Sequence, residues 1–309
     1  MKNFRTVLYR FGLLLGFSIF LYQVIKSFNS LKSFSQEPLF GASILLCLVI
    51  ALLVLFFQIL NWRLILGSMQ VWVPLKKLQE GYVLSFLPRY IPGSIWGYLS
   101  RGEWLKREFN IPYGLTYSAS IMEILIAMSS GVLIAGVYAI AHLSPGFSGW
   151  RILCLLFLPW LIWFALHQIS IRVHFKWHSF QNFIEYFRLI KFIDWIKCLS
   201  IFCIQWLLLG LIPFIFLYQY PNLPGGNVFI GLLDMVTLNS ISWIIGLLII
   251  IFPTGLGIRE FSSSLLIAEL FQISTTSGMA LAVISRLITS FGELIWLVGI
   301  WLRGKFLKQ

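Results

Sequence analysis

Long hydrophobic stretches alternate with short basic segments along the chain, and this alternation predicts its main elements. We expect about six of the stretches to form one transmembrane helix each. They cover residues 11–25, 40–60, 115–141, 152–171, 198–218 and 279–302. Residues 40–60 contain no charge and would be about 31 Å long as an α-helix, which matches the roughly 30 Å hydrocarbon core of a bilayer. The pattern therefore predicts an all-α polytopic membrane protein.

Two further hydrophobic stretches, residues 81–99 and 228–276, are interrupted by residues that break helices. The breakers are Pro88, Pro92, Gly93 and Gly97 in the first stretch and Pro253, Gly255 and Gly257 in the second. Non-helical backbone at membrane depth survives only where it is buried in protein or lines a wet cavity. We therefore expect two re-entrant hairpins, each made of a broken helix.

The order of these elements is the same in the two halves of the chain. Residues 1–309 are expected to form a single membrane domain, with half-repeats at about 1–145 and 146–309. Each half would hold two spans, one hairpin and one more span, and the halves would have opposite orientation. Such inverted repeats place a binding site between their broken elements.

An alternative for the second interrupted stretch is a plain span. Residues 235–252 are uncharged and could cross the bilayer as one helix. The chain would then have to return through residues 262–276, which at about 22 Å of helix are marginal for crossing. The hairpin interpretation avoids this difficulty.

The composition supports a membrane protein. Of the 309 residues, 59% are hydrophobic and 11% are charged, whereas about 25% of the residues of a soluble domain are charged. The formal net charge is +12, but Lys and Arg lie in short segments between the hydrophobic stretches. This distribution is typical of the positive-inside rule and excludes nucleic-acid binding as the main role. It predicts cytoplasmic N- and C-termini and an amphipathic surface helix within residues 172–197.

No pattern in the sequence predicts a cofactor, a metal site or an enzyme. The four cysteines lie in hydrophobic stretches without CxxC spacing. His174 and His178 are four residues apart, but the other two histidines are distant, so a metal site is not expected. The HExxH, GxSxG and Walker A motifs are absent.

Ionisable residues within the predicted membrane segments are the candidate functional residues, because burying a charge in lipid is costly. The candidate anion ligands are Arg89, Arg101, Arg259 and Arg286, and the candidate partners or cation ligands are Glu123, Asp234, Glu260 and Glu293. The planar guanidinium of arginine suits phosphate.

Two structural roles are open alternatives for these charges. Neighbouring charges could neutralise one another, as in a pairing of Arg259 with Glu260 or of Arg286 with Glu293, without touching a ligand. For Arg101 and Glu103 we expect an interfacial position with exposed head groups.

Two motifs carry a resemblance to a known family. LPRYIPGSIWGYLSR at residues 87–101, and FPTGLGIRE at 252–260 followed by the Ser285-Arg286-Leu287 span, resemble the lysylphosphatidylglycerol synthase transmembrane family, also described as flippase-like. The resemblance implies a multi-pass protein of the prokaryotic cell (inner) membrane. In the two-part synthase a soluble aminoacyltransferase domain follows the membrane region. Here Gln309 comes shortly after the last predicted span, so we expect that domain to be absent.

The leading functional hypothesis is therefore a flippase-like protein that moves a phospholipid or a polyprenyl-linked intermediate between leaflets. Arg89 or Arg101, together with Arg259, would hold the phosphate between the broken elements, and Glu123 and Glu260 would orient these arginines or contact a cationic headgroup. Rocking of one half against the other would expose the site alternately.

Two other functions are weighed against transport. The protein could be a non-transporting accessory subunit of an envelope glycosyltransferase or lipid synthase, with residues 172–197 as its docking surface. It could also be an intramembrane enzyme acting on a lipid phosphate, but no pair of nucleophile and base is visible in the sequence.

Overall fold

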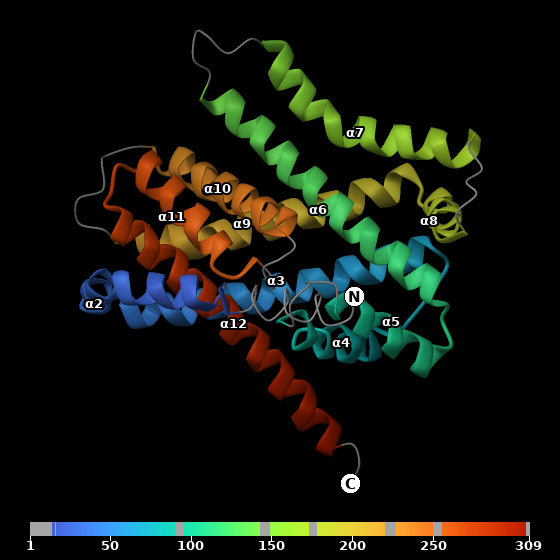
Figure 1. Ribbon diagram of the computed structural model, residues 1–309, viewed down its shortest axis with the longest axis horizontal. Coiled ribbons are helices and arrows are strands. Elements are labelled where there is room, and N and C mark those ends of the chain that lie inside the picture. The colour runs from blue at the N-terminus through green and yellow to red at the C-terminus, as the bar shows by residue number, and fades with distance from the viewer. Residues whose placement is uncertain are drawn as a thin grey trace. The chain divides into compact units, whose positions relative to one another are not determined.

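The computed structural model describes the chain outside residues 1–13, 16, 91–95, 143–148, 173–177, 220–226, 250–254 and 307–309. The described part consists of helices joined by turns and short loops and contains no strand (Figure 1). Its helices are Phe17–Lys26, α2 (Phe28–Ser35), α3 (Phe40–Ser68), α4 (Leu75–Leu84), α5 (Trp96–Phe109), α6 (Tyr113–Ala141), α7 (Gly149–Arg172), α8 (His178–Arg188), α9 (Phe192–Leu217), α10 (Val228–Leu248), α11 (Ile258–Leu270) and α12 (Thr275–Phe306).

Among the described helices, six are long and apolar enough to cross a membrane: α3, α6, α7, α9, α10 and α12. The all-α polytopic architecture is thereby confirmed. The set differs from the predicted one in two places. Helix α10 qualifies as a span by length and composition, since its 21 residues are about 31 Å long, whereas the sequence placed it in a hairpin arm. The described part of the predicted first span forms the shorter helix Phe17–Lys26.

Both predicted interruptions are real breaks between helices. In the first, α4 ends at Leu84, a 3₁₀ turn covers Pro88–Tyr90, and α5 begins at Trp96. In the second, α10 ends at Leu248 and α11 begins at Ile258. Re-entry of these segments into a membrane remains a prediction.

The predicted helix breakers have different positions in these two segments. Gly255 and Gly257 have φ angles of 69° and 82°, a left-handed region that favours glycine. Pro88 begins the 3₁₀ turn. Gly97 instead lies inside α5, because that helix begins at Trp96 and runs to Phe109. This glycine therefore does not break a helix. The remaining breakers, Pro92, Gly93 and Pro253, lie outside the described residues.

The chain divides into two compact units that are discontinuous in sequence. Unit 1 consists of Met1–Leu55, Phe86–Trp96 and Trp206–Gln309, and unit 2 consists of Phe56–Ser85 and Gly97–Gln205. The unit boundaries fall within α3 and α9, just after the end of α4, and after the first residue of α5. The predicted half-repeat boundary near residue 145 falls inside unit 2, and the inverted repeat itself stays a prediction.

Unit 1 is built around a hydrophobic core shared by six helices. Phe34 of α2, Cys47 of α3, Phe216 of α9, Leu238 of α10 and Leu281 of α12 are all buried in it, together with one residue of α11. Helix α11 packs against both α10 and α12, and α12 also packs against α2. This packing brings the start of α11 beside the middle of α12.

Two glycines allow close approach between the helices of unit 1. A Cβ atom at Gly210 of α9 would lie 2.6 Å from the Cα atom of Val236 in α10, and one at Gly278 of α12 would lie 2.5 Å from the carbonyl oxygen of Ser264 in α11. Small residues at helix contacts are the usual way in which membrane helices pack, because lipid supplies no hydrophobic drive between them.

Unit 2 contains α4 to α8 with the adjoining parts of α3 and α9. Helix α8 packs against α6 and α7. Its Phe183, Ile184 and Phe187 side chains are buried, whereas Glu185 and Arg188 are exposed. The described part of residues 172–197 is therefore amphipathic, as predicted, although the segment is two helices, because α9 begins at Phe192.

Candidate functional site

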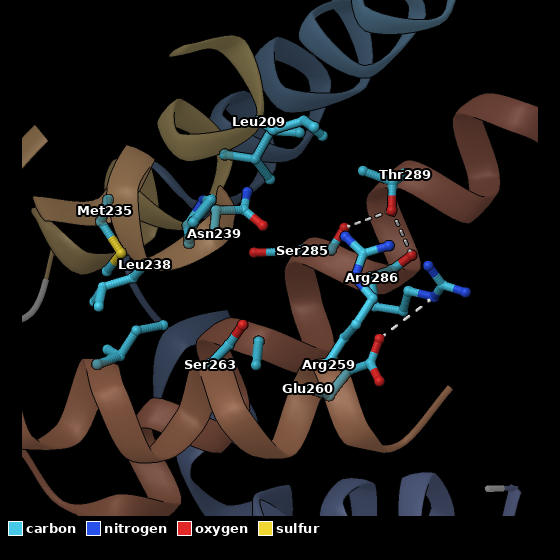
Figure 2. Close-up of a pocket in the computed structure, with 14 residues that line it drawn as sticks. Leu209, Met235, Leu238, Asn239, Arg259, Glu260, Ser263, Ser285, Arg286 and Thr289 are labelled. Atoms are coloured by element: carbon cyan, nitrogen blue, oxygen red, sulfur yellow. Dashed lines mark hydrogen bonds and ion pairs between the residues drawn. The ribbon is translucent and has the colours of Figure 1, made fainter. Parts of the chain in front are cut away.

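The first turn of α11 and the middle of α12 meet at a small cavity in unit 1 (Figure 2). Arg259 and Glu260 come directly after the break, and Arg286 lies on α12, which runs beside α11. The cavity has a volume of about 50 Å³. It is lined by Leu209, Ile212 and Pro213 of α9, Met235, Leu238 and Asn239 of α10, Arg259, Glu260, Ser263 and Ile267 of α11, and Ala282, Ser285, Arg286 and Thr289 of α12.

The carboxylate of Glu260 is buried and has two partners. Its Oε2 accepts a hydrogen bond of 2.7 Å from the backbone N–H of Gly257, the N-cap residue of α11. Its Oε1 lies 3.5 Å from Nε of Arg286. A negative charge in the first turn also interacts favourably with the helix dipole. Glu260 is therefore held in place by α11 itself, and its contact with Arg286 is the longer of the two.

The side chain of Arg259 packs against two glycines, at positions where a larger residue would clash with it. A Cβ atom at Gly246 of α10 would lie 2.3 Å from Cγ of Arg259, and one at Gly255 would lie 3.0 Å from the same atom. The stem of Arg259 is thus packed against two glycines. Figure 2 shows Arg259 and Arg286 side by side at the cavity.

The charges around the cavity favour an anion. Among the described residues that line it, two guanidinium groups face one carboxylate, which gives these three a formal charge of +1. The Ser285 and Thr289 hydroxyls donate to backbone carbonyls of their own helix, so the two guanidinium groups are the donors that this side of the cavity offers to an anion. The volume exceeds the roughly 10–15 Å³ that one water requires. Among the described residues there is no group of His, Cys, Asp and Glu that could hold a metal ion.

Arg101 lies in a different setting, in unit 2. Its Nη1 donates a 2.8 Å hydrogen bond to Oε2 of Glu123, and Oε1 of Glu123 accepts one of 2.8 Å from the Tyr82 hydroxyl. The guanidinium carbon lies 4.6 Å from the ring centre of Trp62, 4.5 Å from that of Tyr82 and 4.8 Å from that of Tyr98. We call these five residues the Arg101 cage.

The expectation that Arg101 has an exposed head group is wrong, since the residue is only 7% exposed. Glu103 does have the expected exposed head group, and its carboxylate accepts a 2.7 Å hydrogen bond from the Tyr113 hydroxyl, while its interfacial position stays a prediction. The physical reason is helix periodicity. Gly97, Arg101, Trp104 and Leu105 lie on the buried face of α5, and Glu103 lies on the other side. That spacing is visible in the sequence and could have indicated that Arg101 is buried.

Arg89 forms a third ion pair, in unit 1. Its Nη2 lies 2.5 Å from Oε1 of Glu293 on α12, and its guanidinium carbon lies 4.6 Å from the ring centre of Phe86. The pair is partly exposed, at 28% for the Arg89 side chain and 15% for that of Glu293. The sequence alone does not predict this pair, because the two residues are far apart along the chain.

The six predicted headgroup residues thus fall into three groups. Arg259, Arg286 and Glu260 meet at one cavity, Arg89 lies in the same unit and pairs with Glu293 of α12, and Arg101 and Glu123 belong to unit 2. Asp234 is buried on α10. The ion pairs of Arg89, Arg101 and Arg286 each join two different helical elements, in contrast to the neighbouring pairs considered from the sequence.

Comparisons with known proteins give one match. A profile of the family described as "Lysylphosphatidylglycerol synthase TM region" matches residues 7–296, which is nearly the whole chain. Neither a search of curated proteins nor a search of solved structures finds a match. The six apolar helices among the described residues are those expected of a membrane region. The chain therefore belongs to the family of lysylphosphatidylglycerol synthase transmembrane regions.

Proposed function

We propose that this protein binds the phosphate of an anionic lipid headgroup in the unit 1 cavity and moves the lipid between the leaflets of the prokaryotic cell membrane. The observation that carries the proposal is the pair of arginines, Arg259 and Arg286, placed at one cavity with a single carboxylate between membrane-spanning helices. No bond is made or broken in this role, so the protein would act as a transporter and not as an enzyme.

The chemistry of the cavity suits a phosphate. A guanidinium group offers several N–H donors in a planar fork that matches phosphate oxygens. A phosphate that takes Arg286 away from Glu260 does not strand the carboxylate, since Glu260 keeps its 2.7 Å hydrogen bond from Gly257. The exchange therefore costs less than the separation of a buried ion pair whose members have no other partner.

The size of the cavity indicates how much of the lipid enters it. A volume of about 50 Å³ is too small for a whole headgroup with its glycerol and acyl chains. We expect the phosphate to enter between Arg259 and Arg286 while the chains remain in the bilayer. Helices whose outer side chains are apolar, such as Leu294 and Val298 of α12, would lie against those chains.

Flipping assays test the proposal. Purified protein is reconstituted in vesicles that carry a fluorescent phosphatidylglycerol, and the fraction of label accessible to an external quencher is followed with time. The double variant Arg259→Ala/Arg286→Ala should flip at the rate of protein-free vesicles. The matched control is Arg107→Ala, which removes an exposed arginine outside the cavity and should flip as the wild type does. Wild-type flipping by the double variant would overturn the proposal.

A further inference from the structure

Helix α12 makes one ion pair with each of the two interrupted segments in unit 1. Arg286 pairs with Glu260, which follows the break between α10 and α11. Glu293 pairs with Arg89, which lies in the 3₁₀ turn of the break between α4 and α5. Residues 286 and 293 are two helical turns apart, so their side chains leave the same face of α12 at positions about 10.5 Å apart along its axis.

We propose that Arg89 is a second binding site for the lipid phosphate, and that the phosphate passes along α12 between the cavity and Arg89 by displacing Glu293. The inference rests on the proposed function, which it deepens by adding a second site on the same path. The carboxylate of Glu293 and a phosphate are both anions that accept hydrogen bonds from a guanidinium group. One can therefore replace the other without leaving Arg89 unpaired.

The surroundings of Arg89 permit such an exchange. The Arg89–Glu293 pair is more exposed, at 28% and 15%, than the Arg101–Glu123 pair, at 8% and 10%. Separating a partly exposed pair costs less free energy than separating a buried one, because water can solvate the two charges. The Phe86 ring orients the guanidinium group.

If Arg89 is a second site, two single variants have different effects: one slows flipping and the other strengthens lipid binding. Arg89→Ala should slow flipping of the fluorescent phosphatidylglycerol by about fivefold or more, which is about 1 kcal/mol, while the affinity of the cavity for soluble dihexanoyl-phosphatidylglycerol stays unchanged. Glu293→Gln removes the competing anion and should tighten binding of that short-chain lipid in calorimetry. A pair with only a structural role would make both variants less stable and both slower.

The variant Arg89→Gln/Glu293→Gln controls for folding. Two amides can hydrogen-bond to each other, so this variant should keep the melting temperature of the wild type but still flip slowly. Recovery of wild-type flipping by this variant would overturn the second site, as would a Glu293→Gln protein with unchanged or weaker lipid binding.

The outcomes also separate this inference from the proposed function. If Arg259→Ala/Arg286→Ala abolishes flipping and Arg89→Ala flips at the wild-type rate, the cavity is retained and the second site is wrong. If the cavity variant itself flips at the wild-type rate, the proposed function is wrong.

Discussion

Units 1 and 2 both bury an arginine beside a glutamate, but the surroundings of the two pairs differ. In unit 2, the Arg101 guanidinium is 2.8 Å from Glu123 and is enclosed by the rings of Trp62, Tyr82 and Tyr98. In unit 1, Arg286 is 3.5 Å from Glu260 and borders a cavity of about 50 Å³.

The difference indicates that an arginine inside the protein needs free space beside its guanidinium group before it can bind a ligand. In the Arg101 cage the space around the guanidinium is taken by three aromatic rings, and Glu123 is fixed by the Tyr82 hydroxyl. Such a pair stabilises the packing of its helices. At the cavity, Glu260 likewise has a second partner, the Gly257 amide, but space remains beside Arg286. Only the second arrangement can exchange a carboxylate for a phosphate at low cost.

The largest expected effect is on the stability of unit 2. Glu123→Ala leaves the buried Arg101 without its carboxylate, and removal of one partner from a buried ion pair typically costs about 3–5 kcal/mol. We expect a clear fall in the melting temperature of the detergent-solubilised protein. Glu103→Ala, on the exposed side of the neighbouring helix α5, is the control and should melt as the wild type does. Equal melting of the two variants would show that the Arg101 cage does not stabilise unit 2.

The next largest effect is expected from a change that moves Arg259 away from the cavity. Gly246→Ala places a Cβ atom 2.3 Å from Cγ of Arg259 and should force that side chain away from the cavity. Overpacking of this kind costs about 1–3 kcal/mol in stability. Lipid binding measured by calorimetry should weaken as well, by about 1.5–3 kcal/mol, because the displaced guanidinium group loses its charged hydrogen bond to the phosphate.

Gly299→Ala is the matched control for this change. It also adds one methyl group to a helical glycine, but nothing lies within 4 Å of the new Cβ atom. Its lipid affinity should equal that of the wild type. If Gly246→Ala and Gly299→Ala bind lipid equally well, the position of Arg259 does not matter for binding.

The smallest effect concerns one ring of the cage. Tyr98→Leu removes one of three rings that face Arg101 but keeps an apolar side chain, so we expect a loss of about 0.5–1 kcal/mol in stability. Chemical or thermal unfolding of the purified protein would measure it. Lipid affinity should not change, because Tyr98 lies in unit 2. A loss of lipid binding without a loss of stability would show that the Arg101 cage binds the lipid and does not only stabilise unit 2.

The sequence predicted the architecture well because long apolar stretches, helix breakers and basic segments are local signals. It also identified Arg259, Arg286 and Glu260 as unusual charges. It did not predict which charges pair, because the bonds of Arg101 with Glu123 and of Arg89 with Glu293 join residues that only the folded chain brings together. The burial of Arg101 was missed for a different reason. Its spacing from Gly97 and Trp104 matches one helix face, but α5 was expected to end before Arg101.

Calorimetric titration of soluble dihexanoyl-phosphatidylglycerol into the wild type and Arg286→Ala tests the central claim most directly. Loss of a charged hydrogen bond to the phosphate is worth about 1.5–3 kcal/mol, so the account predicts that Arg286→Ala binds the lipid about 10- to 100-fold more weakly. The melting temperature should fall less than that of Glu123→Ala, because Glu260 keeps its hydrogen bond from Gly257. Binding by Arg286→Ala with the affinity of the wild type would contradict the assignment of the cavity as the anion site.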